Sequence, residues 1–160
     1  MAARIHIDLA RQRMTLYRGE DALARYAVSS AANGAGERNG SECTPRGRHV
    51  VRAMIGHGAP PGSVFVGRRP TGEIFTPEMR AEAPRRDWIL TRILWLSGCE
   101  VGRNRLGEVD SMRRYIYIHG APDDVDFGRP GSRGCIRMRG RDVVELFERV
   151  APGTPVQIDG

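Results

Sequence analysis

The stretch Ser132-Arg133-Gly134-Cys135-Ile136-Arg137 decides the fold and the chemistry expected of this chain. An alternating apolar run at 115–118 leads to His119 and Gly120, and His119 precedes Cys135 by 16 positions. The alternation predicts a strand that ends at His119, followed by a Gly, Pro and Asp loop that returns to Cys135. A cysteine nucleophile needs an imidazole to take its proton, and a neighbouring glycine lets a substrate carbonyl approach the backbone amides. The two segments therefore predict a nucleophile and its base.

Ile-His-Gly followed by Ser-x-Gly-Cys-Ile-Arg resembles the L,D-transpeptidase catalytic domain, also called the YkuD domain. The segment Ser41-Glu42-Cys43-Thr44-Pro45-Arg46-Gly47 is similar to the Ser-x-x-Thr-Pro-x-Gly turn of that family. Residues 141–150 and 153–156 are similar to its closing helix and strand. The resemblance covers most of the chain. It implies one domain over residues 1–160, mainly β with one or two short helices, with a YkuD-like sandwich or barrel-like sheet.

The resemblance also implies a role for each residue of the pair. The thiolate of Cys135 would attack the carbonyl between the L-centre of the third stem residue of peptidoglycan and D-alanine. His119 would act as general base, and later as the acid that protonates the departing amine. In the family, the next residue or a backbone carbonyl orients this imidazole. Because Gly120 has no side chain, we expect a carbonyl to fix the tautomer here.

The residues around Cys135 are expected to support it. We expect backbone N–H groups of Gly134 and Cys135, together with Arg133, to form an oxyanion hole. Arg133 and Arg137 would lower the pKa of the thiol if their charges lie nearby. We place Arg137, Ser132 and Gly120 in substrate binding: the planar guanidinium of Arg137 suits a carboxylate, and Ser132 would tie the loop by hydrogen bonding. The loop acids Asp123, Asp124 and Asp126 either recognise an amine or solvate the turn, and we leave them outside the site.

Length and charge restrict the possible partners. A chain of 160 residues suits a single domain. All 25 basic residues are arginine, against 19 acidic residues, which gives a formal charge of +6 and favours anionic partners. Binding to single-stranded nucleic acid relies on aromatic stacking, yet only 6% of residues are aromatic and the arginines are scattered. The resemblance implies peptidoglycan stem peptides or muropeptides as partners, and their free carboxylates would be attracted by this charge; a basic surface that is only solvated is the alternative. We expect no nucleic acid, and a monomer.

We expect no organic cofactor and no metal. The cysteines lack the paired close spacing of a structural zinc site. A metal site built from His119 and Cys135 is conceivable, but we rank it below a catalytic role for these two residues. With Cys135 as the nucleophile, Cys43 and Cys99 either form a disulfide or remain two small buried thiols in a reducing compartment.

Periodicity predicts the order of the elements. We expect a three-strand meander over residues 5–29, then strands at 49–55, 88–96, 115–119 and 154–158, with a helix at 141–150. Residues 56–87 contain five of the ten prolines and five glycines, and predict a loop excursion with short strands at 63–66 and 73–75. In the resembled family, a segment at this position overhangs the catalytic cleft.

The pattern of the amino terminus indicates the expected compartment, and the compartment indicates the expected acceptor of the acyl group. It alternates like a strand and lacks the apolar core of roughly 7 to 15 residues of a signal peptide. No stretch approaches the ~20 apolar residues of a membrane span. As written, the chain is expected in the cytoplasm, or in the periplasm if a leader was removed. Few amine acceptors exist in the cytoplasm, so we expect water to accept the acyl group, as in an L,D-carboxypeptidase that recycles muropeptides.

Three alternatives stay open. A secreted L,D-transpeptidase would pass the acyl group to an amine and form peptidoglycan crosslinks. Sortase-like transpeptidases also place His before Cys and Arg after it, but their His-to-Cys interval is much longer. A non-catalytic basic module that binds murein or nucleic acid would explain the charge, but it has no need for His119 and Cys135 together.

Overall fold

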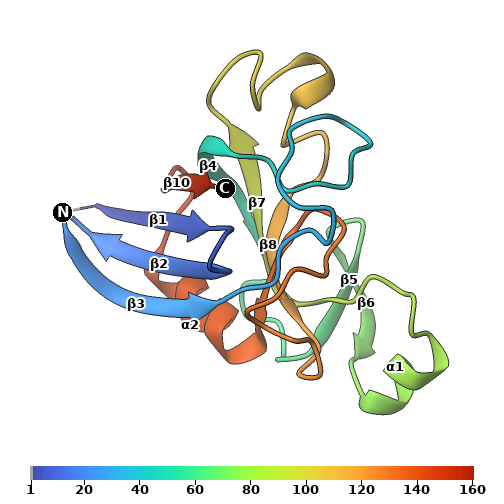
Figure 1. The fold of residues 1–160 in the computed structure, drawn as a ribbon. Helices are drawn as coiled ribbons and strands as arrows, with labels where there is room; N and C mark the ends of the chain where they lie inside the picture. The colour runs from blue at the N-terminus through green and yellow to red at the C-terminus, as the bar shows by residue number, and fades with distance from the viewer. Residues whose placement is uncertain (1) are drawn as a thin grey trace.

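Ten strands form one curled sheet in the computed structural model, which describes residues 2–160 (Figure 1). The first half contains β1 (Ala3–Asp8), β2 (Arg13–Arg18), β3 (Asp21–Ala27), β4 (Gly47–Ile55), β5 (Ser63–Val66), β6 (Arg69–Ile74) and α1 (Pro77–Glu82). The second half contains β7 (Ile89–Gly98), the 3-10 turn η1 (Gly107–Val109), β8 (Tyr117–Ala121), β9 (Ile136–Arg139), α2 (Gly140–Arg149) and β10 (Pro155–Asp159).

The long strand β7 organises the sheet. The strand order is β3-β2-β1-β10-β4-β7-β5-β6, and β8 and β9 branch from β7. One edge of β7 pairs with β4 and β5, and the other edge pairs with β8. β8 and β9 run parallel. A parallel pair needs a long crossover, and here the loop 122–135 makes it, so that this loop delivers Cys135 to the start of β9.

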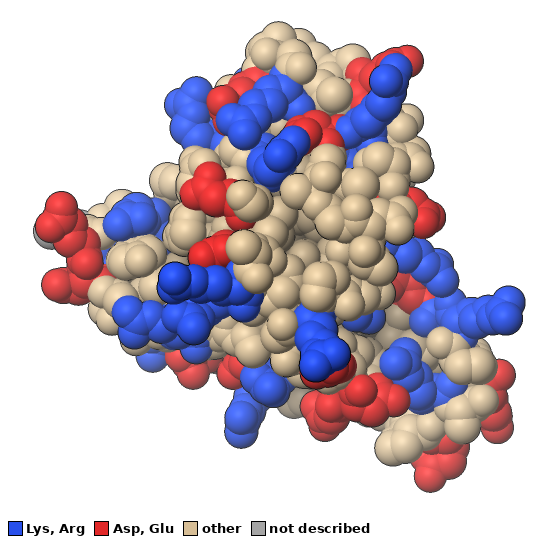
Figure 2. Space-filling model, in the orientation of Figure 1, with Lys and Arg blue, Asp and Glu red and all other residues tan. Residues whose placement is uncertain are grey.

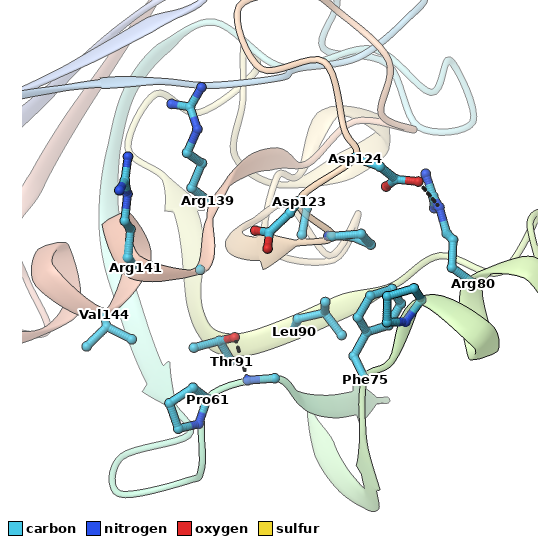
Figure 3. Close-up of a pocket in the computed structure, with 15 residues that line it drawn as sticks. Pro61, Phe75, Arg80, Leu90, Thr91, Asp123, Asp124, Arg139, Arg141 and Val144 are labelled. Carbon is cyan, nitrogen blue, oxygen red and sulfur yellow. Dashed lines mark hydrogen bonds and ion pairs between the residues drawn. The ribbon is translucent and has the colours of Figure 1, made fainter.

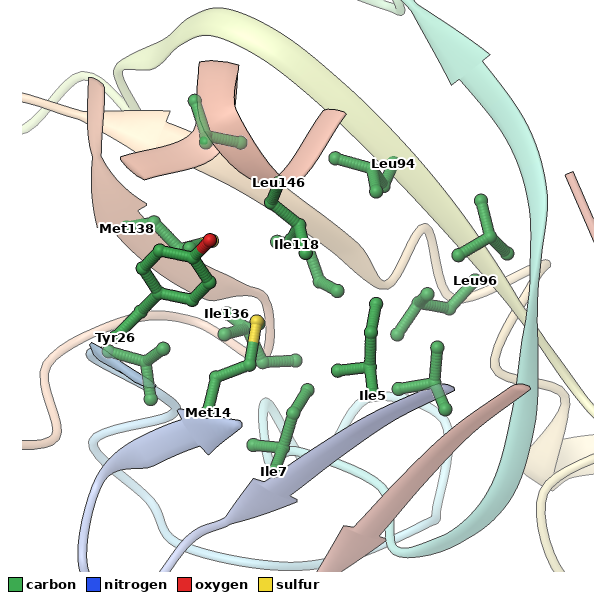
Figure 4. Packing of buried hydrophobic residues seen from close by; sticks show 14 of the residues in the cluster. Ile5, Ile7, Met14, Tyr26, Leu94, Leu96, Ile118, Ile136, Met138 and Leu146 are labelled. Atoms are coloured by element: carbon green, nitrogen blue, oxygen red, sulfur yellow. The ribbon is translucent and has the colours of Figure 1, made fainter. Parts of the chain in front are cut away.

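One hydrophobic core fixes the position of β8 and β9. Ile118 of β8 and Ile136 of β9 are fully buried together with Ile5, Met14 and Leu146, the last of which belongs to α2 (Figure 4). Complete burial of such a side chain stabilises a fold by roughly 1.5–3 kcal/mol. Because alternate residues of a strand face opposite sides, the neighbours of Ile118 and Ile136 point away from this core.

The predicted fold class is confirmed, since residues 2–160 are mainly β with two α-helices. The strand predicted at 115–119 is shifted, because Tyr115 has φ +56°, outside the extended region. The piece predicted at 73–75 is the end of the longer β6. Helix α1 within the excursion was not predicted, although the Thr76 cap, which accepts a 3.3 Å hydrogen bond from the Met79 amide, and Pro77 in the first turn are typical helix-start residues.

The three cysteines are free thiols. Cys43 and Cys99 therefore do not form the disulfide that was one of the two alternatives. Both are half-buried, so the other alternative, two small buried thiols, describes them only in part.

Charged side chains are mixed over the surface. Figure 2 shows arginines and acidic residues interspersed on one face rather than gathered into one basic patch. Several arginines are ion-paired, such as Arg46 with Glu37 at 2.7 Å and Arg86 with Glu73 at 2.9 Å. Among the helices in residues 2–160, none is long and apolar enough to cross a membrane.

Candidate active site

His119 is a buried imidazole with one free nitrogen. Its side chain lies on β8 and is only 1% exposed. Nδ1 donates a 2.7 Å hydrogen bond to the carbonyl oxygen of Gly120, which places the proton on Nδ1 and leaves a lone pair on Nε2. Nε2 is buried and has no hydrogen-bond partner within residues 2–160. Burial lowers the pKa of His119, so the ring is neutral and able to accept a proton. The carbonyl expected from the sequence is that of Gly120 itself.

Cys135 is a neutral, half-buried thiol. Its Sγ accepts a hydrogen bond from the Tyr117 amide and donates one to the Tyr115 carbonyl, both at 3.3 Å. Burial raises the pKa of Cys135 to about 12, against the opposing effects of the Tyr117 N–H, Arg114 and Arg137. Arg137 lowers this pKa, as expected of a flanking arginine, but desolvation outweighs its effect. The thiol therefore needs a base to become a nucleophile.

The imidazole and the thiol lie on the same face of β8 and β9. His119 pairs with Arg137 across the two strands, on the face opposite to the core. Cys135 packs in a cluster with Tyr117 and Ile93, and Ile93 is the β7 partner of His119. Two residues along a strand span about 7 Å, so Cys135 lies one such step before Arg137. No hydrogen bond joins Cys135 to His119 within the described chain, and Nε2 remains unpartnered for a proton transfer.

Ser132 closes the loop that carries the thiol. Its hydroxyl donates to the Cys135 carbonyl at 2.6 Å and accepts from the Gly134 amide at 3.2 Å. The Gly134 amide, expected to donate to the oxyanion, is engaged by Ser132 in this conformation, and its oxyanion role stays a prediction. Ser132 is buried and bonds within the loop, rather than facing substrate. The Cys135 amide has no acceptor among residues 2–160, so it is the candidate oxyanion donor.

Thr44 orients that candidate donor. Its hydroxyl donates to the Gly134 carbonyl at 2.9 Å and accepts from the Ala31 amide at 3.0 Å. In a trans peptide the carbonyl and the following N–H point in opposite directions, so holding the Gly134 carbonyl sets the direction of the Cys135 amide. Gly134 has φ +134°, a conformation that favours glycine. The sequence analysis placed Thr44 in a turn and missed this contact.

The two flanking arginines have different surroundings. Arg137 is half-buried, its Nη2 donates to Ser29 Oγ at 2.7 Å, and its buried Nε has no partner within residues 2–160. Arg133 is exposed and donates to the Arg85 carbonyl at 2.8 Å, which ties the loop to the excursion. Asp87 was missed: among the neighbouring charges, its carboxylate has the largest effect on the pKa values of His119, Cys135 and Arg137. Nothing in its local sequence pattern sets Asp87 apart.

The aromatic side chains of Trp95 and Tyr117 pack in the same cluster as Cys135. Trp95 contacts Tyr117 edge to face with ring centroids 6.0 Å apart. Arg68, at the turn between β5 and β6, donates to the Tyr117 hydroxyl at 3.0 Å, and its Cζ lies 4.6 Å from the Trp95 ring centroid and 5.1 Å from that of Tyr115. The excursion thus reaches the residues whose backbone holds Cys135.

A cavity of about 1050 Å³ extends the same face in the other direction (Figure 3). Ala121 and Arg139 line it, and they are the next outward pair of β8 and β9 after His119 and Arg137. The excursion contributes another part of the lining, including Phe75. Within residues 2–160, no three His, Cys, Asp or Glu side chains come together to hold a metal ion.

Comparison with known families decides the relationship. Residues 2–158 match the model of the L,D-transpeptidase catalytic domain. This chain belongs to the L,D-transpeptidase catalytic domain family. Over 46 residues it is 46% identical to a putative L,D-transpeptidase YkuD of Bacillus licheniformis, a match that covers 29% of the chain and 28% of that protein.

Solved L,D-transpeptidase structures share the fold. An L,D-transpeptidase from Mycobacterium smegmatis superposes with a TM-score of 0.58 at 15% identity, covering 99% of this chain and 59% of the other. A mutant L,D-transpeptidase of Enterococcus faecium superposes with a TM-score of 0.59 at 16% identity, covering 99% of this chain and 50% of the other. This chain therefore spans about half to three-fifths of those L,D-transpeptidase chains.

Proposed function

We propose that this chain is a cysteine acyltransferase that acts on peptidoglycan tetrapeptide stems and releases D-alanine. One observation carries the proposal: a neutral imidazole with a buried, unpartnered Nε2 lies on the same strand face as a thiol that needs a base. Membership of the L,D-transpeptidase family supports the choice of substrate.

The first half-reaction uses the site as follows. His119 Nε2 takes the thiol proton while Cys135 Sγ attacks the carbonyl that precedes D-alanine. The Cys135 amide, oriented through Thr44 and Gly134, donates to the oxyanion. When the C–N bond breaks, the imidazolium gives its proton to the departing amine of D-alanine. A thioester on Cys135 and free D-alanine result.

The second half-reaction frees the enzyme. With water as acceptor, as expected from the sequence, the product is a tripeptide and the protein is an L,D-carboxypeptidase. The second candidate is an amine acceptor, which gives a new amide bond and, on a second stem, a crosslink. The cavity lined by Ala121, two residues after His119 on β8, favours this second candidate, because it offers room for another substrate.

Release of D-alanine from a tetrapeptide muropeptide tests the proposal. We expect release by the wild type, none by Cys135→Ala, and normal release by Cys99→Ala, which removes another free thiol. Undiminished release by Cys135→Ala rejects the nucleophile. A folded wild type that binds murein but releases nothing supports the non-catalytic module instead. Mass analysis of the products then separates tripeptide from crosslinked dimer.

A further inference from the structure

We propose that Arg114 is a positioning residue for the catalytic thiol: its guanidinium clamps the turn at Cys43 against the peptide that carries Cys135, and its fixed positive charge stabilises the thiolate as it forms. This inference rests on the proposed function and deepens it, because it names the group that makes a weakly acidic thiol usable. Arg114 lies outside the two segments that carry His119 and Cys135, and no sequence pattern set it apart.

The proton transfer of the proposed reaction requires such a charge. Burial raises the pKa of Cys135 to about 12 and lowers that of His119. When the proton moves from Sγ to Nε2, a neutral pair becomes a thiolate and an imidazolium, and burial disfavours both charged forms. A permanent cation near the sulfur stabilises the thiolate without itself exchanging a proton.

The guanidinium of Arg114 is half-buried and donates only to neutral groups. Nη1 donates to the Gly36 carbonyl at 3.3 Å, and Nη2 donates to the Cys43 carbonyl at 2.6 Å and to Ser41 Oγ at 3.4 Å. Within residues 2–160, Arg114 forms no ion pair with a carboxylate. Its positive charge is therefore held in place by three acceptors that do not neutralise it.

Arg114 reaches the thiol through two backbone carbonyls. The carbonyl of the next residue, Tyr115, accepts the hydrogen bond from Cys135 Sγ at 3.3 Å. The Cys43 carbonyl, which Arg114 holds, packs against Gly134, where a Cβ atom would lie 3.3 Å from that oxygen. Arg114 is therefore joined both to the acceptor of the thiol hydrogen and to the turn that packs on the peptide bearing the thiol.

The same clamp fixes Thr44. The Gly36 amide donates to the Thr44 carbonyl at 2.9 Å, and the Thr44 hydroxyl donates to the Gly134 carbonyl at 2.9 Å. Because Arg114 holds the carbonyls of Gly36 and Cys43, it fixes both strands of the turn from which Thr44 orients the candidate oxyanion donor.

Three charged side chains act on the pKa of the catalytic thiol. Arg114 and Arg137 lower it, whereas Asp87 raises it. The acid that acts on Arg114 is Glu37, which is already paired with Arg46 at 2.7 Å. With Glu37 engaged elsewhere, the charge of Arg114 is available to the sulfur.

Alkylation of Cys135 by two reagents of similar size tests the charge. In the Cys43→Ala/Cys99→Ala background, rate constants are measured for neutral iodoacetamide and for anionic iodoacetate. Their ratio depends neither on the thiolate fraction nor on how open the site is. We expect Arg114→Gln to lower the iodoacetate-to-iodoacetamide ratio about threefold, because a cation close to the sulfur attracts the anionic reagent. Arg114→Lys, which keeps the charge, should keep the wild-type ratio.

The direction of the iodoacetamide rate separates the charge from a merely structural role. Removing a cation a few Å away raises the pKa of Cys135 by about one unit, and the remaining thiolate is more nucleophilic, so Arg114→Gln should react about threefold more slowly. Loosening of the turn alone would open the site and speed the reaction. The matched control is Arg113→Gln, which removes an equal charge from the exposed neighbour and should change neither the rate nor the ratio.

A second removal of the charge does not depend on the folding of Arg114→Gln. The chain contains no lysine, so Arg114→Lys carries a single ε-amine. Acetylating that amine in the folded protein with an N-hydroxysuccinimide ester, followed by hydroxylamine to free the thiols, should lower the iodoacetate-to-iodoacetamide ratio as Arg114→Gln does.

Release of D-alanine supplies the catalytic readout. Because the charge acts on the sulfur in the transition state, Arg114→Gln should lower kcat roughly tenfold at an unchanged KM, and Arg114→Lys should restore most of it. A wild-type ratio after loss of the charge, faster alkylation of Arg114→Gln, or an equal effect of Arg113→Gln overturns the inference. Absence of D-alanine release by the wild type rejects the proposed function instead, since alkylation needs no peptidoglycan substrate.

Discussion

The hydroxyl of Thr44 donates a 2.9 Å hydrogen bond to the carbonyl oxygen of Gly134, a residue 90 positions away in the chain. This contact joins the turn before β4 to the loop that carries Cys135. Because the carbonyl and the following N–H of a trans peptide point in opposite directions, it also directs the Cys135 amide away from Thr44.

Replacing Thr44 by valine should impair both folding and acylation. Thr44→Val leaves the Ala31 amide and the Gly134 carbonyl without partners, at a cost of about 1–3 kcal/mol for each buried group. Loss of an oriented oxyanion donor lowers catalysis by roughly 10² to 10³-fold. Urea unfolding and D-alanine release measure the two effects. Thr44→Ser, which keeps the hydroxyl, should retain most of both, and a fully active Thr44→Val would exclude this role.

Arg68 should act as a positioning residue for the thiol. It fastens the turn between β5 and β6 to the Tyr117 hydroxyl and the Trp95 ring, and the Tyr117 amide holds Sγ. Arg68→Ala should lower stability by about 1–2 kcal/mol through the lost hydrogen bond and cation–π contact. It should also speed alkylation of Cys135 by iodoacetamide.

The exposed neighbour Arg69 provides the control for Arg68. Arg69→Ala removes an equal charge from the same hairpin and should change neither quantity. If both variants alkylate at the same rate, the effect arises from charge rather than from the Arg68 anchor.

Gly120 should not tolerate a side chain. A Cβ atom there would lie 2.5 Å from the carbonyl oxygen of Leu90, so β7 and β8 would have to separate. Because the Gly120 carbonyl holds His119, Gly120→Ala should lower both the unfolding midpoint and D-alanine release. Gly140→Ala is the stability control, since its Cβ would meet nothing closer than 3.6 Å. Equal stability of the two variants would contradict the tight β7–β8 spacing.

The pH dependence of thiol alkylation should show a neutral pair. Burial raises the pKa of Cys135 to about 12. The fraction of the thiol present as reactive thiolate therefore rises with pH throughout the neutral and alkaline range. Burial lowers the pKa of His119, so the imidazole supplies no positive charge above its ordinary pKa of about 6.5. In a Cys43→Ala/Cys99→Ala background, the rate should rise about tenfold per pH unit from 7 to 10, as the thiolate fraction does. A plateau near neutral pH would instead indicate a preformed thiolate–imidazolium pair.

Local sequence patterns predicted the part of the site that is formed by residues close together in the sequence. Alternation placed His119 on a strand, although β8 does not end there and continues to Ala121. The missing side chain of Gly120 led to the expectation of a backbone carbonyl, which hydrogen-bonds Nδ1. Helix α2 was predicted because its apolar residues repeat at helical spacing. Helix α1 could also have been predicted from Thr76 and Pro77.

The rest depends on contacts that only the fold creates. The contacts of Thr44 with Gly134 and of Arg68 with Tyr117 join residues 90 and 49 positions apart. The raised pKa of Cys135 comes from burial, which the flanking arginines in the sequence do not reveal. Asp123 was left outside the site because a turn aspartate has no distinctive local pattern, yet it lines a cavity built from distant segments.

Intact-protein mass after rapid acid quenching tests the central claim most directly. Mixed with a tetrapeptide muropeptide, the wild type should gain the mass of the substrate minus D-alanine, and peptide mapping should place the adduct on Cys135. His119→Gln should form it far more slowly, because the base is lost. Folded wild type that forms no adduct and releases no D-alanine, or an equal adduct on Cys135→Ala, would contradict the account.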